Sequence, residues 1–251
     1  MRGEAMTSDS PLHFLRFEFK YVLDRRTRDA LEAAMQPFLD LDPFVARQPG
    51  SRYFVRSLYF DDARFSAFHD KIDGRLHREK FRLRTYGRAL DDPAPWFLEQ
   101  KGRHDCLVFK HRTPLSSVID RRARGERLAR QVLASAPAGD LRSRFEVAYL
   151  RDGIRPYVLV DYERRPYVSR FDPDFRVTFD SDLAARASDT MATSSAQARG
   201  LLRGYTVMEV KFRRVIPAWF QRLVQAFELR RRSVSKVCEA TDALAVASAS
   251  S

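Results

Sequence analysis

The chain has 251 residues, 44% of them hydrophobic, which is enough for one packed domain. Its 45 Lys and Arg residues against 33 Asp and Glu residues give a formal net charge of +12, which favours an anionic partner such as nucleic acid, an anionic membrane or a phosphorylated small molecule. Two cysteines exclude a disulfide framework, and no apolar run has transmembrane length or resembles a secretory signal, so we expect a cytoplasmic protein.

The first half of the chain predicts strands with short helices between them. Five segments alternate apolar and polar residues, as half-buried strands do: His13–Leu23, Tyr53–Phe60, Arg78–Tyr86, Trp96–Lys101 and Leu107–Arg112. Asp24 is placed to cap a helix that runs to about Leu39, and Asp61 or Asp62 to cap a shorter one. The last two strands are expected to form a hairpin joined through Gly102–Asp105.

The second half predicts helices first and strands afterwards. Residues 114–152 have helical spacing, with Pro114 opening the first helix and Gly139-Asp140 separating it from the second. Three strands follow: Tyr157–Tyr167, Phe175–Phe179 and Val207–Phe212. The Ala-, Ser-, Thr- and Gly-rich stretch 185–204 is expected to be a mobile loop, and Pro217–Leu229 is typical of an amphipathic helix.

Strands spread along the whole chain, with helices inserted between them, favour a single domain. We predict the α+β class, with an antiparallel eight-stranded β-barrel and helices packed outside it and near its mouth. This domain is expected to span residues 13–241, after a flexible N-terminus at 1–12 and before a disordered Ala- and Ser-rich tail at 242–251.

Charged residues recur at the spacing of a strand. Glu18 and Lys20, Glu99 and Lys101, and Glu209 and Lys211 are each two residues apart, and Lys80, Arg82 and Arg84 follow the same spacing. Residues i and i+2 of a strand share one face, about 6.5–7 Å apart. Several strands turning such faces toward one shared space would hold a polyanion together with a divalent cation. The alternative is a solvated basic face of the kind that binds nucleic acid.

Further basic residues lie in strand-like runs flanked by apolar residues: Lys110, Arg112, Arg164 and Arg176. Packing like charges around a cavity is costly unless anions occupy it. Glu18, Glu99 or Glu209 could hold Mg²⁺ or Mn²⁺, because these hard cations accept carboxylates and bridge phosphate oxygens. The alternative for each acid is an ion pair with its Lys or Arg neighbours.

Several other chemistries are disfavoured. The sequence has no P-loop, no HExxH zinc motif and no GxSxG nucleophile elbow. Cys106 and Cys238 are expected to be packing residues rather than nucleophiles. Tyr59 and Tyr162, among other aromatic residues near the basic positions, would suit stacking on single-stranded nucleic acid, but strands also use such residues on their packed face.

Nine short motifs together resemble one known family. In order, they are Phe17–Tyr21, Ser57–Asp61, Lys80–Gly87, Phe97–Lys101, Lys110–Arg112, Tyr162–Arg164, Arg176–Asp180, Met208–Lys211 and Ser235-Lys236. Over about residues 13–241 the chain resembles the VTC domain, the polyphosphate polymerase domain of the vacuolar transporter chaperone complex. The resemblance implies the fold of the triphosphate tunnel metalloenzymes, antiparallel barrels whose lumen binds triphosphate.

The resemblance also implies roles for particular residues. The catalytic residues would be Arg82, Arg84, Lys101 and Lys236. The phosphate-binding residues would be Lys20, Lys80, Lys110, Arg112, Arg164, Arg176, Lys211 and Ser235. Glu209, together with Glu18, would hold Mn²⁺ or Mg²⁺.

The implied activity is ATP-dependent polyphosphate synthesis, with ATP and polyphosphate as ligands. A triphosphatase on the same barrel and a non-catalytic polyphosphate-binding module stay open as alternatives, and nucleic acid is an unlikely partner. The wider superfamily often has ExExK on its first strand, whereas Arg16 stands here at the first acidic position, which favours synthesis or binding over hydrolysis. No membrane segment is expected in this chain, so anchoring would need a membrane-bound partner.

Overall fold

The computed structural model describes residues 17–245, except 47, 90, 106, 117–118 and 193–197. Its ten strands are β1 (Phe17–Asp24), β2 (Leu39–Leu41), β3 (Tyr53–Asp61), β4 (Arg78–Thr85), β5 (Phe97–His104), β6 (Leu107–Pro114), β7 (Arg155–Ser169), β8 (Arg176–Ala187), β9 (Arg199–Gly200) and β10 (Tyr205–Phe212). Its helices are α1 (Arg25–Met35), α2 (Ser66–Ile72), α3 (Gly125–Ser135), α4 (Asp140–Val147), α5 (Ala218–Ala226) and α6 (Lys236–Leu244).

Eight strands form one curled antiparallel sheet, in the order β1-β10-β8-β7-β3-β4-β5-β6, while β2 pairs with β7 and β9 with β8. The predicted α+β class and eight-stranded antiparallel sheet are confirmed. Within the described residues the backbone ladder ends at β1 and β6, so the sheet is a half-barrel. Lys101 on β5 reaches across to Glu18 on β1, with 3.3 Å between nitrogen and oxygen. We call this opening the seam; it lies between β1 at one end of the sheet and the β5–β6 hairpin at the other.

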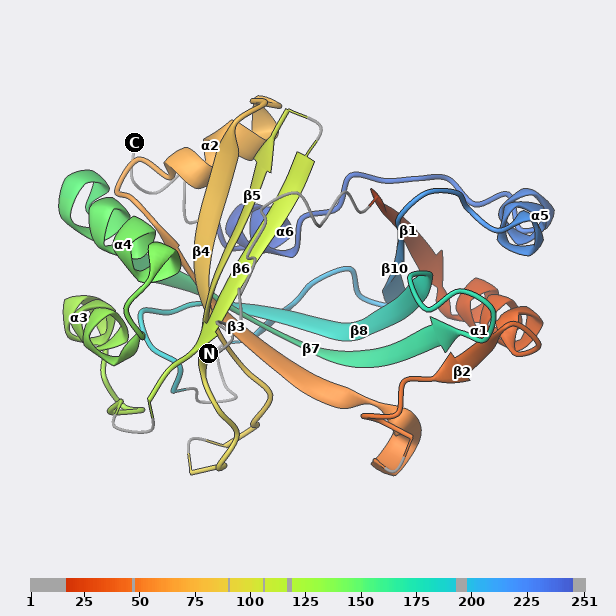
Figure 1. The fold of residues 1–251 in the computed structure, drawn as a ribbon, viewed down its shortest axis with the longest axis horizontal. Coiled ribbons are helices and arrows are strands. Elements are labelled where there is room, and N and C mark those ends of the chain that lie inside the picture. The colour runs from red at the N-terminus through yellow and green to blue at the C-terminus, as the bar shows by residue number, and fades with distance from the viewer. Residues whose placement is uncertain are drawn as a thin grey trace, which may run out of the picture.

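Helices cover the convex face of the sheet in two groups, which Figure 1 shows at opposite ends of the molecule. Phe145 of α4 packs edge-on against Phe60 and Phe81, with ring centroids 5.2 and 5.4 Å away. Phe220 of α5 packs against Tyr21 and Phe175 in the same way at the β1–β10 end. Burial of these apolar faces leaves the opposite, concave face of the strands for α6 and for the charged residues.

Helix α6 lies on the concave face, which the sequence did not lead us to expect. Val237, Cys238 and Ala240 pack there against apolar residues of β3, β7, β8 and β10. Cys238 is buried in this core, as expected of a packing residue, whereas Cys106 lies outside the described residues. The helix continues to Leu244, past the expected start of the tail at residue 242.

The predicted start of the first helix is confirmed, but its predicted end is wrong. An Asp24 carboxylate oxygen accepts a hydrogen bond from the Thr27 backbone N–H at 2.9 Å, which is an N-cap. The helix ends at Met35, because Pro37 has no N–H with which to continue the helical ladder. The chain then forms β2, whose Leu39 pairs with Ser169 of β7.

The β5–β6 hairpin is longer than predicted. Strand β5 continues to His104, and β6 runs from Leu107 to Pro114. Pro114 therefore ends a strand instead of opening a helix, and the next helix begins only at Gly125. Gly102 lies under the Phe109 ring so closely that a Cβ atom there would be 2.1 Å from the ring. The absence of a side chain at this position therefore lets the hairpin extend.

The stretch expected to be a mobile loop is partly sheet. Strand β8 extends to Ala187, β9 pairs with it, and Arg124 forms a bridge with Thr190. The expectations for residues 1–16 and 246–251, and that for 193–197, lie outside the described residues. In the part of the chain that is described, no helix has the length and apolar character needed to cross a bilayer.

Candidate functional site

The charged side chains expected from the strand spacing gather on the concave face. The β1–β10 register places Lys20 opposite Glu209, and the β4–β5 register places Arg82 opposite Glu99. Strands far apart in the sheet also meet there, as the seam contact shows. We call this group the inner cluster: Glu18, Lys20, Lys80, Arg82, Arg84, Glu99, Lys101, Lys110, Arg112, Arg164, Asp180, Glu209, Lys211 and Lys236.

One half of the inner cluster is centred on Glu99, whose side chain is 0% exposed. Arg82 donates to one carboxylate oxygen through Nη2 at 2.6 Å and Nε at 2.7 Å, while Lys110 Nζ is 2.8 Å from the other oxygen. Arg84 and Arg112 lie 3.7 and 3.6 Å away. Burial alone would raise the pKa of Glu99, but the surrounding cations, Arg82 first, lower it below its usual range. Glu99 therefore stays ionised and fixes Arg82.

The other half is centred on Asp180 and Glu209. Arg164 binds Asp180 with two nitrogens, both at 2.6 Å, and lies 3.3 Å from Glu209. Lys236, at the start of α6, bridges the same two acids at 2.6 and 2.8 Å. Burial opposes ionisation, but Lys236 and Lys20 lower the pKa of Glu209, and Arg164 and Lys236 lower that of Asp180. Both carboxylates are therefore charged at neutral pH.

Lys101 and Lys110 of the inner cluster, and Tyr59 beside it, have pKa values shifted toward physiological pH. Burial lowers the pKa of Lys101 and of Lys110 to about 8, despite the opposing effects of Glu18 and Glu99 respectively. The Tyr59 hydroxyl accepts a hydrogen bond from Arg82 at 3.0 Å. Burial raises the pKa of Tyr59, but Arg82 and Arg84 lower it overall to about 8. An anion brought into this region would favour the charged form of both lysines.

Cations outnumber carboxylates in the inner cluster by ten to four. Lys80 has no carboxylate partner among the described residues, and its Nζ instead lies 3.3 Å from Ser235 Oγ. Burial lowers the pKa of Lys80. Arg176, the first residue of β8, is exposed beside Lys211 on the same face. The excess lies in side chains that solvent still reaches, since Lys101, Lys110, Arg112 and Lys211 are 32–43% exposed. Like charges gathered in this way repel one another unless anions lie between them, so the concave face is suited to receive anions.

The structure brings all the predicted site residues to this face, with Arg176 at its edge. The Glu–Lys pairs expected two residues apart occur for Glu18 with Lys20 at 3.1 Å and for Glu209 with Lys211 at 3.8 Å. Asp180 was missed as a site residue. It lies within β8, in the run Arg176-Val-Thr-Phe-Asp180, whose period-two polarity could have identified it.

The oxygen donors fit a divalent cation if phosphate supplies the remaining ligands. Glu209 and Glu18 lie on adjacent strands, and Thr178 lies directly opposite Glu209 on β8. The Thr178 hydroxyl is buried and makes no hydrogen bond among the described residues. Mg²⁺ is commonly held by one or two carboxylates together with substrate phosphates, which matches this set. The three-residue group with metal-ligand spacing in the described structure, His77, His104 and Asp105, is exposed at the hairpin tip instead.

Comparison with known proteins identifies the family. Among solved structures, a Bacillus halodurans protein provisionally described as an adenylate cyclase shares the fold, with a TM-score of 0.51 and 11% identity over 88% of this chain and 96% of that chain. Comparison with the curated proteins gives no match. The sequence model of the VTC domain matches residues 15–245, which include every strand and helix described above. The chain therefore belongs to the VTC domain family.

Proposed function

We propose that this protein is an ATP-dependent polyphosphate polymerase whose active site is the inner cluster. The observation that carries the proposal is the excess of cations over carboxylates on the concave face, which favours a ligand with several negative charges. ATP and a phosphate chain are ligands of that kind. Membership of the VTC domain family supports the same choice.

Arg82 and Arg84 are the best-positioned residues to stabilise the phosphoryl group in transfer. Arg82 is held by Glu99 and Tyr59, and Arg84 donates to Ser57 at 3.1 Å and to Tyr162 at 3.2 Å. Because both guanidinium groups are already fixed, little reorganisation is needed when charge develops on the equatorial oxygens.

In the proposed reaction, a terminal oxygen of the phosphate chain attacks the γ-phosphorus of ATP. A new P–O bond forms, the bond from the γ-phosphorus to the bridging oxygen breaks, and ADP leaves with that oxygen. Lys101 and Lys110 become fully protonated as the anions bind, and they neutralise the two reacting phosphates. A Mn²⁺ or Mg²⁺ ion held by Glu209 and Glu18 with phosphate oxygens would add further neutralising charge when bound.

The test is to incubate the protein with ATP and Mn²⁺ and to separate the products on a gel that stains phosphate polymers. Polymer together with ADP supports the proposal. Phosphate release without polymer would show a triphosphatase, tight polyphosphate binding without turnover a binding module, and stronger, salt-dependent binding of RNA or DNA a nucleic-acid protein.

Site variants show whether the inner cluster does this work. Arg82→Ala should lower kcat by about 10²–10³-fold, the usual loss for a preorganised charge-stabilising donor. Arg82→Lys keeps a positive charge beside Glu99 and reports the loss of guanidinium geometry alone. Arg222→Ala, at an exposed position on α5, is the matched control and should leave kcat unchanged. Equal activity of Arg82→Ala and Arg222→Ala would place the reaction elsewhere.

A further inference from the structure

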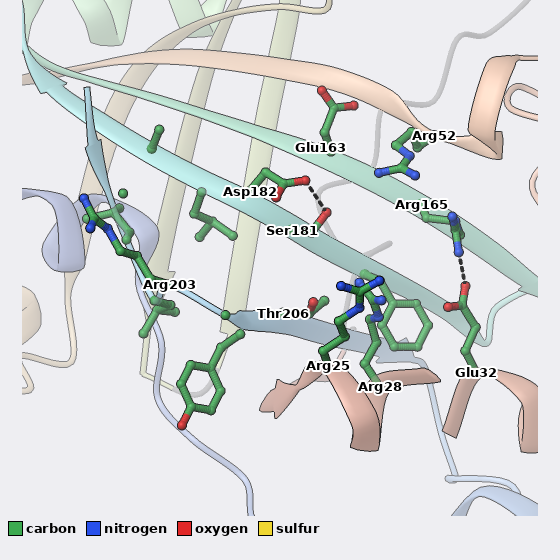
Figure 2. A pocket seen from close by; sticks show the side chains of 18 residues that line it. Arg25, Arg28, Glu32, Arg52, Glu163, Arg165, Ser181, Asp182, Arg203 and Thr206 are labelled. Atoms are coloured by element: carbon green, nitrogen blue, oxygen red, sulfur yellow. Dashed lines mark hydrogen bonds and ion pairs between the residues drawn. The ribbon is translucent and has the colours of Figure 1, made fainter. Parts of the chain in front are cut away.

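A second basic site lies on the opposite side of the sheet from the inner cluster. A cavity of about 690 Å³ opens beside α1 and the turn that joins β9 to β10 (Figure 2). Phe179 and Arg165 line it, and both belong to the convex face: Phe179 packs in the core under α1, and Arg165 pairs with Glu32 of α1 at 2.8 Å. The sheet itself therefore separates this cavity from the inner cluster.

Five arginines from four separate segments line this cavity, which we call the outer arginine pocket: Arg25, Arg28, Arg52, Arg165 and Arg203. Figure 2 shows Arg25 and Arg28 near one end, with Arg165 and Arg52 on the same side of the view, and Arg203 at the other end. Convergence of segments so distant in sequence is a property of the fold. Like charges brought together in this way repel one another unless anions lie between them.

The carboxylates of the outer arginine pocket do not balance these charges. Glu32 is already shared by Arg165 and Tyr167. Glu163 pairs with Arg88, which does not line the pocket. The remaining acid, Asp182, accepts a hydrogen bond from Ser181.

Two of the five arginines have no acidic partner at all in the part of the chain that the structure describes. These are Arg52 and Arg203, and both are exposed. Arg28 pairs with its neighbour Asp29 at 2.5 Å, while Arg25 is 3.9 Å from the same carboxylate. Arg25, Arg52 and Arg203 therefore keep donors that are free to bind a ligand.

We propose that the outer arginine pocket binds a phosphorylated small molecule, at a site distinct from the inner cluster. Guanidinium forks match phosphate oxygens in geometry and charge, and the cavity volume suits a ligand the size of a short oligophosphate. The pocket is framed on one side by β7 and β8 and on the other by α1. This proposal does not rest on the activity proposed for the inner cluster.

The test is isothermal titration calorimetry with tripolyphosphate at physiological ionic strength. The wild-type protein is expected to bind one equivalent at the outer arginine pocket and, under the proposed function, a second at the inner cluster. The double variant Arg52→Ala with Arg203→Ala should weaken one of them by about tenfold or more, as charge-assisted hydrogen bonds are lost. Neither residue has an ion-pair partner among the described residues, so the melting temperature should not change.

Two further variants make the result specific. Arg214→Ala with Arg222→Ala removes the same charge from exposed positions outside the pocket and should leave both equivalents unchanged. Arg82→Ala with Arg84→Ala should weaken only the other equivalent.

Four outcomes are distinguished. Unchanged binding by the Arg52 and Arg203 variant overturns the outer pocket, and so does an equal loss in the Arg214 and Arg222 control, which would indicate charge alone. Loss of one equivalent in the Arg52 and Arg203 variant alone supports it. If the Arg82 and Arg84 variant keeps both equivalents while the Arg52 and Arg203 variant loses one, the result contradicts the proposed function but supports the outer arginine pocket.

Discussion

Replacing Lys236 by methionine tests the electrostatics of the concave face most directly. The Lys236 side chain is 8% exposed, and its ammonium lies 2.6 Å from Asp180 and 2.8 Å from Glu209. Methionine fills similar volume but leaves the two buried carboxylates with Arg164 as their shared partner, while Lys20 and Lys211 lie 3.7 and 3.8 Å from Glu209. Orphaning a buried charge costs about 3–5 kcal/mol, and because Arg164 stays we expect a loss of about 3 kcal/mol in the free energy of unfolding at pH 7.

The loss should depend on pH with a definite sign. In the wild type the pKa values of Asp180 and Glu209 are lowered, so these acids stabilise the fold above their unfolded pKa of about 4 and lose that effect as pH falls. In the variant the two carboxylates bind protons more readily. The difference in unfolding free energy between the two proteins should therefore shrink on acidification from pH 7 to pH 4.

Urea unfolding followed by the fluorescence of Trp96 and Trp219 measures this difference at both pH values. Lys211→Met is the matched control, because its ammonium lies 3.8 Å from the same Glu209 but its side chain is 32% exposed. We expect the control to lose no more than about 1 kcal/mol. An equal loss in the two variants, or a difference that grows on acidification, would refute the proposed role of Lys236.

Three further predictions concern the local structure and the lysines. Gly102→Ala should lower the free energy of unfolding by about 1–3 kcal/mol, because its Cβ would collide with the Phe109 ring, and thermal unfolding would measure this. Asp24→Ala removes the cap of α1 and should cost about 1 kcal/mol, whereas Asp24→Ser should restore most of that in urea unfolding. The pKa of Lys101 and of Lys110 is lowered to about 8, so tripolyphosphate affinity should fall as pH rises from 7 to 9, with proton uptake on binding near pH 8 that calorimetry in two buffers would detect.

Local sequence signals predicted much of the sheet but not all of its boundaries. Alternation of polar and apolar residues found the central strands, and Asp24 correctly marked the start of α1. The errors came where one local signal was given too much weight. Pro114 fits a helix start in isolation, yet it ends β6, whose next residue Leu115 still bonds to the backbone of Trp96.

Helix α6 was missed for a different reason. It is short, and its first residue, Lys236, was assigned to the Ser235-Lys236 motif as a catalytic residue, so no helix was predicted from there. Its apolar residues Val237, Ala240 and Leu244 do have helical spacing, so the pattern was present.

For the site, spacing alone predicted which side chains share a face but not their partners. Glu99 follows the same pattern as Glu18 and Glu209, yet it pairs with Arg82 on the next strand rather than with Lys101 two residues away. That choice depends on the register between β4 and β5, which is set by the packing of distant segments. The outer arginine pocket was not predicted at all, because its five arginines come from segments with no shared sequence pattern.

The seam has a mechanical consequence for the whole half-barrel. Everywhere else along the sheet, pulling two neighbouring strands apart breaks a continuous row of backbone hydrogen bonds. Between β1 and β5 the described polar contact is the ion pair of Glu18 with Lys101, whose side chain is 32% exposed, and such pairs contribute at most about 1 kcal/mol. The half-barrel therefore resists opening least at the seam. Salt, which screens this ion pair, should loosen the seam before it weakens the pairing of any two strands.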